Sequence, residues 1–401
     1  MTQEIPAMPD QFFDMAFFQN PHEPFAKVRQ DTPVYETVLP EGLKVWLVTR
    51  YEDVRALHAD PRLGKDLRPF FAKLGMPPEV GPLGMQVAIS DPPDHTRLRK
   101  LANKAFTPRQ FANLRPKTEL ITDRLLDAIA DRPEVDLVDA LAWPLPLAVV
   151  CEMLGVPEAE RGDFAAWAEV VRGLRSPAEF PVVAQAMADT MGRVLAAKRA
   201  EPADDLMTAM IEARVGEDRF DEAEQVSMAL QMVVAGVETV AHLITSGIYA
   251  LLTHPGQLAA LRADWSLLPN AVEEVLRWET PVNLGQPRLV LETLEVGGVT
   301  IPEGELVSVS VLSANRDADR FPDPERLDIT RQTAGQMAFG HGIHYCLGAP
   351  LARMEGEVAF ERILRRFPDL SLAVDPAEVQ WLPNPVTRGL ASLPVRPGTS
   401  G

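Results

Sequence analysis

Cys346 lies near the end of the glycine-rich sequence Phe339-Gly340-His341-Gly342-Ile343-His344-Tyr345-Cys346-Leu347-Gly348. Glycine adopts left-handed backbone conformations at little cost, so the three glycines predict a chain wrapped closely around a group that contacts the sulfur. Residues 349–364 have helical periodicity, with Pro350 in the first turn. Cys346 is therefore expected just before a helix N-terminus, where free amide groups and the helix dipole favour a thiolate.

A buried, unreactive cysteine is the ordinary alternative, because free cysteine is among the most buried residue types. The glycines, the phenylalanine and the histidine at fixed offsets from Cys346 favour a ligand or nucleophile instead. A second alternative is a structural metal held by His341, His344 and Cys346. A structural zinc site needs a fourth ligand, however, and the stretch does not offer one.

The composition is that of an ordinary soluble globular protein, with 46% apolar and 24% charged residues. We find no run that approaches the roughly 18 apolar residues of a membrane span, and residues 1–4 are polar and acidic, so we expect a cytoplasmic protein without a membrane segment. Cys151 and Cys346 are the only cysteines, which excludes a disulfide framework. The net charge of −18 argues against a nucleic acid partner.

One long helix is expected from Glu222 to Thr253, after the cap-like Asp221, and it is apolar on nearly every side. This pattern predicts burial through the middle of the protein. Inside the helix lies Ala235-Gly236-Val237-Glu238-Thr239, whose acid and hydroxyl need partners when buried. Glycine beside threonine can open the helical hydrogen-bond ladder locally. The alternative is a packing glycine next to a threonine bonded back to the preceding turn.

A second helix is expected after Asp91, and it begins a basic segment. Residues 95–118 contain seven lysines or arginines and no acid. His95 and Arg99 are four residues apart and share one face. A solvated helix face is the alternative to a partner-binding role.

Glu274 and Arg277 are three residues apart on a helix predicted over 270–278. As an exposed pair they would contribute about 0.2–0.5 kcal/mol and indicate little. Their neighbours are apolar, and buried charges must be paired to be tolerated.

In their order along the chain, these motifs resemble those of the cytochrome P-450 superfamily, the haem-thiolate monooxygenases. Residues 339–348 resemble the haem-ligand loop, and residues 235–239 resemble the oxygen-activation motif. Glu274 and Arg277, with Arg326 from the downstream Phe321–Arg326 segment, resemble the structural Glu-Arg-Arg triad of the family. The resemblance covers most of the chain.

The resemblance implies a mainly α fold with a smaller β-rich part, the cytochrome P-450 fold, in which the long central helix lies over a haem held by the cysteine loop. It implies a single domain over residues 1–401. The expected β-rich portions are about 30–50, 285–312 and 379–395, and the expected helical portions are about 92–280 and 349–366.

The resemblance also assigns roles to individual residues. Cys346 becomes the axial ligand of the haem iron, and Glu238 with Thr239 becomes a proton relay, supported by Ala235 and Gly236. This sequence has Glu238 where Asp is commoner and Val240 where a second threonine is usual, and neither change removes the relay. The further cofactor-binding residues implied are His95, Arg99, Arg288, His344, Phe339, Gly340 and Gly348. The implied substrate pocket comprises Met85, Gln86, Val87, Val234, Val282, Asn283, Leu284, Val386 and Thr387, and the implied redox-partner face comprises Arg97, Lys100, Lys104 and Arg109.

The implied cofactor is haem b, with dioxygen as co-substrate and electrons from NAD(P)H through an acidic ferredoxin and a ferredoxin reductase. The implied activity is hydroxylation or epoxidation of a hydrophobic small molecule by a monomer. Residues 91–99 resemble those of soluble actinobacterial members that act on polyketides, including macrolides, and other secondary metabolites, or that hydroxylate steroid-like molecules. A steroid, terpenoid or fatty-acid hydroxylase and a non-catalytic haem-thiolate binding protein are the alternatives.

Overall fold

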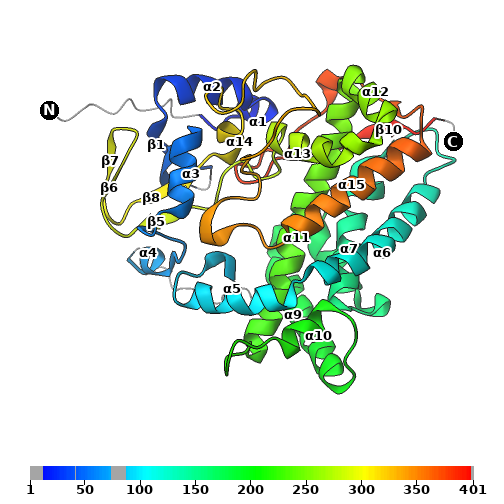
Figure 1. Cartoon of the computed structure of the whole chain (residues 1–401), viewed down its shortest axis with the longest axis horizontal. Coiled ribbons are helices and arrows are strands. Elements are labelled where there is room, and N and C mark those ends of the chain that lie inside the picture. The colour runs from blue at the N-terminus through cyan, green and yellow to red at the C-terminus, as the bar shows by residue number, and fades with distance from the viewer. Residues whose placement is uncertain (1–11, 41, 74–86, 399–401) are drawn as a thin grey trace.

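The computed structural model describes residues 12–40, 42–73 and 87–398. Met85 and Gln86, two of the predicted pocket residues, lie outside the described residues. Figure 1 shows most of the strands at one side of the molecule and the long helices at the other, where β10 (Pro394–Arg396) also lies. The segment that leads to α15 (Ala349–Arg366) lies between the two sides.

Helices make up most of the described chain, and α11 (Glu222–Thr253) runs through the middle of the helical part (Figure 1). Helices α7, α9, α13 and α15 all pack against it. The other α-helices are α1 (Met15–Gln19), α2 (His22–Asp31), α3 (Tyr51–Ala59), α4 (Arg68–Lys73), α5 (Asp94–Ala105), α6 (Pro108–Asp127), α7 (Pro144–Leu154), α8 (Gly162–Val171), α9 (Phe180–Ala200), α10 (Leu206–Glu212), α12 (Pro255–Ala263), α13 (Leu268–Trp278), α14 (Val311–Ala314) and α15 (Ala349–Arg366). Short helical turns are η1 (Val87–Ile89), η2 (Val138–Ala142), η3 (Glu158–Glu160), η4 (Pro177–Glu179), η5 (Trp265–Leu267), η6 (Gly342–His344) and η7 (Pro376–Glu378).

The strands form a five-stranded sheet in the order β1-β2-β8-β5-β3, a three-stranded sheet in the order β4-β10-β9 and the β6-β7 hairpin. Strands β1 and β2 form an antiparallel hairpin within the β-rich portion expected at about 30–50, and β2 pairs in parallel with β8, with Trp46 opposite Val307. The strands are β1 (Val34–Val38), β2 (Lys44–Val48), β3 (Leu63–Gly64), β4 (Val135–Asp136), β5 (Arg288–Val290), β6 (Leu294–Val296), β7 (Val299–Ile301), β8 (Leu306–Val309), β9 (Ser371–Leu372) and β10 (Pro394–Arg396). The predicted mainly α fold with a smaller β-rich part is confirmed.

Helix α11 begins at a capping box, in which Asp221 accepts from the Glu224 amide and the Glu224 side chain accepts from the Asp221 amide. By length and composition it could cross a membrane, contrary to our expectation that no segment would reach this threshold. Of its most apolar window, 67% is buried inside the protein. A buried core helix meets the same criteria, so length and composition do not by themselves indicate a membrane span.

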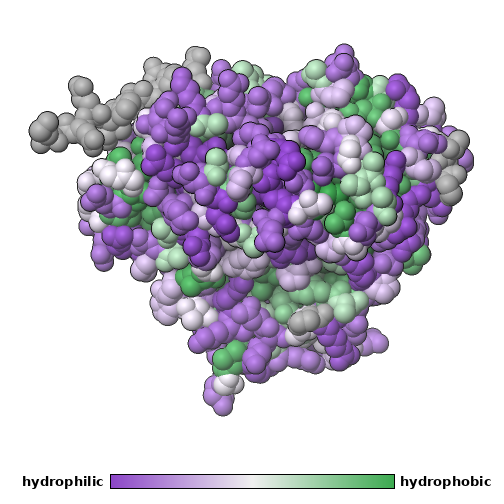
Figure 2. All heavy atoms as spheres, turned by 45° about the horizontal axis from the view of Figure 1, so that its top comes forward, coloured by the Kyte–Doolittle hydropathy of each residue, from purple (hydrophilic) through white to green (hydrophobic). Residues whose placement is uncertain are grey.

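The largest apolar core surrounds α11 and contains residues of α5, α7, α9, α13 and α15, whereas two smaller cores lie against the sheet. Figure 2 shows a mostly hydrophilic face with small, scattered groups of apolar residues. Isolated apolar residues of this kind are normal on protein surfaces. The functional groups must therefore be sought between the cores, where α11, α15 and the sheet meet.

Candidate active site

The loop before α15 holds Cys346 at the edge of an internal cavity of about 440 Å³. The Cys346 amide donates to the Phe339 carbonyl oxygen at 2.9 Å and so closes the loop. Gly340 and Gly342 have φ angles of 73° and 76°, as the sequence predicted for a tightly wrapped chain. Gly348 does not adopt this left-handed conformation, since its φ is −83°. A Cβ atom at this position would lie 3.9 Å from the Cys346 sulfur.

Enclosure by surrounding protein atoms is the main influence on the Cys346 thiol and raises the pKa of that group, although the cysteine is exposed at the cavity. Hydrogen bonds from the Gly348 and Ala349 amides, at the start of α15, and the charge of Arg99 act in the opposite direction. The predicted helix N-terminus is thus present. In the protein alone, however, burial raises the pKa of the thiol more than the helix N-terminus lowers it. A bound metal cation would supply the missing positive charge, because coordination deprotonates a thiol.

Of the predicted cofactor-binding residues, Arg99, Arg288 and His344 line this cavity, and His95 packs against His344. The His95 and His344 ring centroids are 4.1 Å apart. Both ring nitrogens of His95 are buried and have no hydrogen-bond partner among the residues that the structure describes. Arg288 is buried and donates to the Leu57 and His58 carbonyl oxygens at 2.9 and 3.1 Å.

Two further basic side chains at this cavity, His58 and Lys65, were missed by sequence reasoning. Burial and the charge of Arg288 lower the pKa of Lys65 to about 8, and the same two influences lower that of His58 to about 3. Within the described part of the chain, the buried Nε2 atom of His58 has no hydrogen-bond partner. No spacing rule could have found them, because Arg288 lies more than 200 residues away along the chain.

These residues fit a haem. Crowded cations with lowered pKa values would be stabilised by a pair of carboxylates, which haem carries as propionates. The unpartnered nitrogens of His95 and His58 are available as donors to such groups. The Cys346 sulfur faces the same cavity and matches the thiolate ligation of haem iron. Among the described residues, no cluster of three or more His, Cys, Asp or Glu side chains could hold a metal ion, so the structural-metal alternative lacks its ligand set.

The wall opposite the cysteine loop is the middle of α11, where Ala235, Gly236, Glu238 and Thr239 line the cavity. The helix stays α-helical through this segment, so the ladder does not open, and Thr239 Oγ1 donates to the Ala235 carbonyl oxygen at 2.6 Å. Glu238 Oε1 accepts from Thr387 Oγ1 at 2.8 Å and lies 3.3 Å from His242 Nε2. Although burial would raise the pKa of Glu238, these contacts and the His242 charge hold it below its ordinary value.

Most predicted pocket residues that the structure describes do line the cavity: Val87, Val234, Val282, Leu284, Val386 and Thr387. Asn283 does not. It is buried, its amide donates to the Val386 carbonyl oxygen at 2.8 Å, and its side chain accepts from Ser310, so it supports the wall from behind. The lining residues that sequence reasoning missed include Phe106, Val150, Met153, Gln231, Met232 and Glu355.

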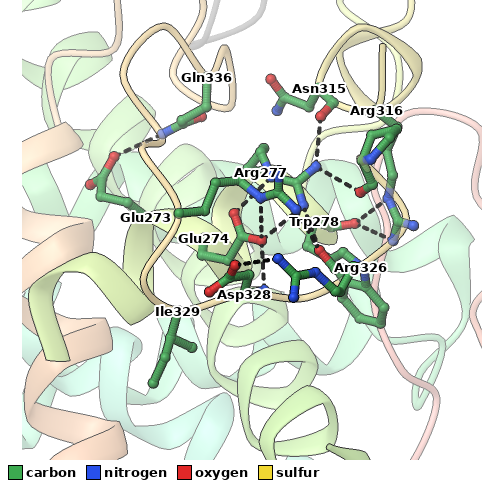
Figure 3. A network of polar contacts seen from close by, with 12 residues as sticks. Glu273, Glu274, Arg277, Trp278, Asn315, Arg316, Arg326, Asp328, Ile329 and Gln336 are labelled. Atoms are coloured by element: carbon green, nitrogen blue, oxygen red, sulfur yellow. Dashed lines mark hydrogen bonds and ion pairs between the residues drawn. The ribbon is translucent and has the colours of Figure 1, made fainter. Parts of the chain in front are cut away.

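Glu274 and Arg277 form the predicted buried pair, with both side chains 0% exposed and two hydrogen bonds of 2.7 and 2.9 Å between them (Figure 3). The third member is not Arg326. Its side chain is 61% exposed and pairs with Asp323 and Asp328, and only its carbonyl oxygen contacts Arg277. Arg331 occupies the position in the triad that was predicted for Arg326, because its Nε donates to Glu274 Oε1 at 3.1 Å.

The predicted redox-partner face is only partly free. Lys100, Lys104 and Arg109 are exposed on α5 and α6. Arg97 instead pairs with Glu224, at the start of α11, and with Asp218. Its charge therefore joins α5 to α11 and is not offered to a partner.

A cysteine loop, a cationic rim and a long helix carrying an acid and an alcohol, around one mostly aliphatic cavity, define a haem-thiolate enzyme. The Cytochrome P450 family model matches residues 182–391. Cytochrome P450 107B1 of Saccharopolyspora erythraea is 47% identical over 99% of both chains. The vitamin D(3) 25-hydroxylase of Pseudonocardia autotrophica is 43% identical over 96% of both. The solved structure of PksS, a cytochrome P450 of the Bacillus subtilis bacillaene polyketide synthase, has a TM-score of 0.89 at 35% identity and covers 97% of this chain and 100% of its own.

The chain belongs to the cytochrome P450 family and is a P450 monooxygenase. Enzymes of this family use haem and dioxygen, take electrons from redox partners and bind hydrophobic substrates.

Proposed function

We propose that this monooxygenase hydroxylates or epoxidises a polyketide-type secondary metabolite, such as a macrolide. One observation carries the proposal: the cavity that joins Cys346 to Glu238 and Thr239 is walled mainly by aliphatic side chains from α11, from residues 282–284 and from residues 386–387. Such a wall suits a bulky hydrophobic molecule with few polar groups. The similarity to PksS of a polyketide synthase supports the choice of class.

Haem, when bound, would supply the oxidation chemistry, and the protein supplies its position and the path of protons. Cys346 would ligate the iron, while Phe339, Gly340 and Gly348 shape the loop that presents the sulfur. His95, Arg99, Arg288 and His344, joined by His58 and Lys65, would bind the propionates. On the opposite wall, Glu238 and Thr239 would relay protons, and the aliphatic side chains would orient the substrate and exclude water.

We further propose that the cofactor is haem b and that NAD(P)H is the source of the electrons. An acidic ferredoxin with its reductase would deliver the electrons to a cytoplasmic, monomeric, single-domain enzyme. Lys100, Lys104 and Arg109 form an exposed basic surface, and Ile343 and Tyr345 of the cysteine loop are exposed apolar residues. Complementary charge favours an acidic partner there.

The first experiment is the absorption spectrum of the reduced, carbon-monoxide-bound protein, with Cys346→Ala as the control. The ferric protein is then titrated with 6-deoxyerythronolide B, mycinamicin IV, vitamin D3 and myristic acid. A thiolate-type band that Cys346→Ala lacks, with a high-spin shift for a macrolactone, is the expected result. A normal band in Cys346→Ala would overturn the ligand assignment, and a shift with myristic acid alone would overturn the substrate class.

A steroid-like substrate is the second candidate, because a relative 43% identical to this chain is named as a vitamin D(3) 25-hydroxylase. A high-spin shift with vitamin D3 and none with the macrolactones would favour it.

A further inference from the structure

His242 lies one helical turn after Glu238 on α11, on the side of the carboxylate away from the cavity. It is 1% exposed and does not line the cavity, whereas the Glu238 side chain is 22% exposed and does. His242 Nε2 and Thr387 Oγ1 both contact Glu238 Oε1. An imidazole nitrogen can donate to a carboxylate only when it carries the hydrogen, so this contact requires the Nε2–H form or the doubly protonated ring.

The His242 ring is fixed by its surroundings. A side chain at Gly389 would place its Cβ 1.9 Å from His242 Nδ1, so only glycine leaves room for the ring at this point. Gly389 has no left-handed backbone conformation to explain its presence. On another side the Trp143 ring meets the imidazole edge-on, with 6.4 Å between the centroids. The ring therefore has little freedom to turn away from Glu238.

We propose that His242 is the positioning residue for the Glu238 carboxylate. Resting on the proton-relay role proposed for Glu238 and Thr239, the inference adds the group that orients the acid. Two donors from different segments, α11 and residues 386–387, fix Oε1, so the carboxylate is held at the cavity wall instead of turning back along the helix. Loss of the His242 donor would leave the carboxylate held from one side and slow its delivery of protons.

Substrate-free turnover measures this delivery without knowledge of the substrate. NADPH, a plant-type ferredoxin and its reductase would supply electrons. Oxygen leaves as hydrogen peroxide after taking up two electrons and two protons, or as two water molecules after taking up four of each. Slower proton delivery therefore raises the share of peroxide.

His242→Gln and His242→Phe separate hydrogen bonding from packing. Glutamine can keep a donor near the Nε2 position, whereas phenylalanine keeps the ring and removes the donor. We expect the peroxide share to rise severalfold in His242→Phe and to stay near the wild-type value in His242→Gln. The reverse order would show that His242 acts by packing alone and would overturn the proposal. The carbon-monoxide spectrum of each variant serves as the check that the haem site is intact.

A double-mutant cycle provides a readout that needs no turnover. The melting temperatures of His242→Phe, Glu238→Gln and the double variant are compared with the wild type. We expect a coupled cycle, in which His242→Phe lowers the melting temperature less in the Glu238→Gln background. Additive shifts would mean that His242 does not act through Glu238. This outcome differs from failure of the proposed function, which would appear as a missing thiolate band in the wild-type protein.

Discussion

Arg331 Nε donates to Glu274 Oε1 at 3.1 Å, and Arg277 binds the same carboxylate from the other side. Arg331 also donates to the carbonyl oxygens of Asp323 and Arg326, at 2.9 and 3.0 Å. The contact between Arg331 and Glu274 therefore connects α13 to residues 322–331, the segment that leads toward the cysteine loop.

Removal of Arg331 is expected to destabilise the protein far more than removal of Arg326. Arg331→Ala leaves a fully buried carboxylate and several carbonyl oxygens with fewer donors, at a cost of about 2–3 kcal/mol. Arg326→Ala removes an exposed side chain and should change stability by about 0.5 kcal/mol or less. The melting temperatures of the two variants test this. Equal losses would contradict the network as described.

Lys65→Met is expected to weaken haem retention. Lys65 lines the cavity together with Arg99 and Arg288, and its ammonium group would pair there with a propionate. The rate of haem transfer from the protein to an excess of apomyoglobin measures haem retention. We expect Lys65→Met to raise this rate severalfold. Lys100→Met is the matched control, because Lys100 is exposed and does not line that cavity. A rate as slow as that of the wild type would remove Lys65 from the propionate site.

Lys104→Glu is expected to weaken the electron donor's binding, whereas Arg97→Gln should leave it nearly unchanged. Lys104 is exposed, but Arg97 is engaged by Glu224 and Asp218. The Michaelis constant for ferredoxin at low ionic strength should rise severalfold in Lys104→Glu, and added salt should reduce the difference. If Arg97→Gln gave the larger rise, the assignment of the two side chains would be reversed.

Glu355 should make stability fall as the pH rises. Burial raises the pKa of this carboxyl from 4.5 to about 8, and its two oxygens have no hydrogen-bond partner in residues 12–40, 42–73 and 87–398. The folded protein keeps the proton up to about pH 8 and the unfolded chain loses it near pH 4.5, so stability is lost between these values by up to about 1.4 kcal/mol per pH unit. Glu355→Gln should remove this part of the slope. Melting temperatures measured from pH 5 to 8 would show it, and parallel curves for the two proteins would contradict it.

Thr239→Ala is expected to keep haem and to raise the share of electrons that ends in hydrogen peroxide. The hydroxyl lies at the cavity wall and donates to the Ala235 carbonyl oxygen. Thr239→Ser retains a hydroxyl at this position and is the matched control. Peroxide formed per NADPH consumed is the measurement, and an unchanged ratio in Thr239→Ala would remove the hydroxyl from the relay.

Local patterns were enough to predict α11, with its cap at Asp221, and the helix that follows Cys346. They could not identify partners that meet only through the tertiary fold. Arg331 and Arg326 lie five residues apart in one irregular segment, and only the path of that segment decides which side chain turns inward. Likewise, the charge of Arg97 could be counted from the sequence, but its pairing with Glu224 depends on how α5 packs near the start of α11.

The parallel pairing of β2 with β8 places Trp46 opposite Val307. During translation, β2 therefore leaves the ribosome about 260 residues before the strand that completes its hydrogen bonds. At about 5–20 residues per second this interval lasts roughly 10 to 50 seconds. Throughout this time the nascent hairpin carries an unpaired edge, of the kind that pairs with other chains. The N-terminal hairpin thus stays open to pairing with other chains until β8 has been synthesised.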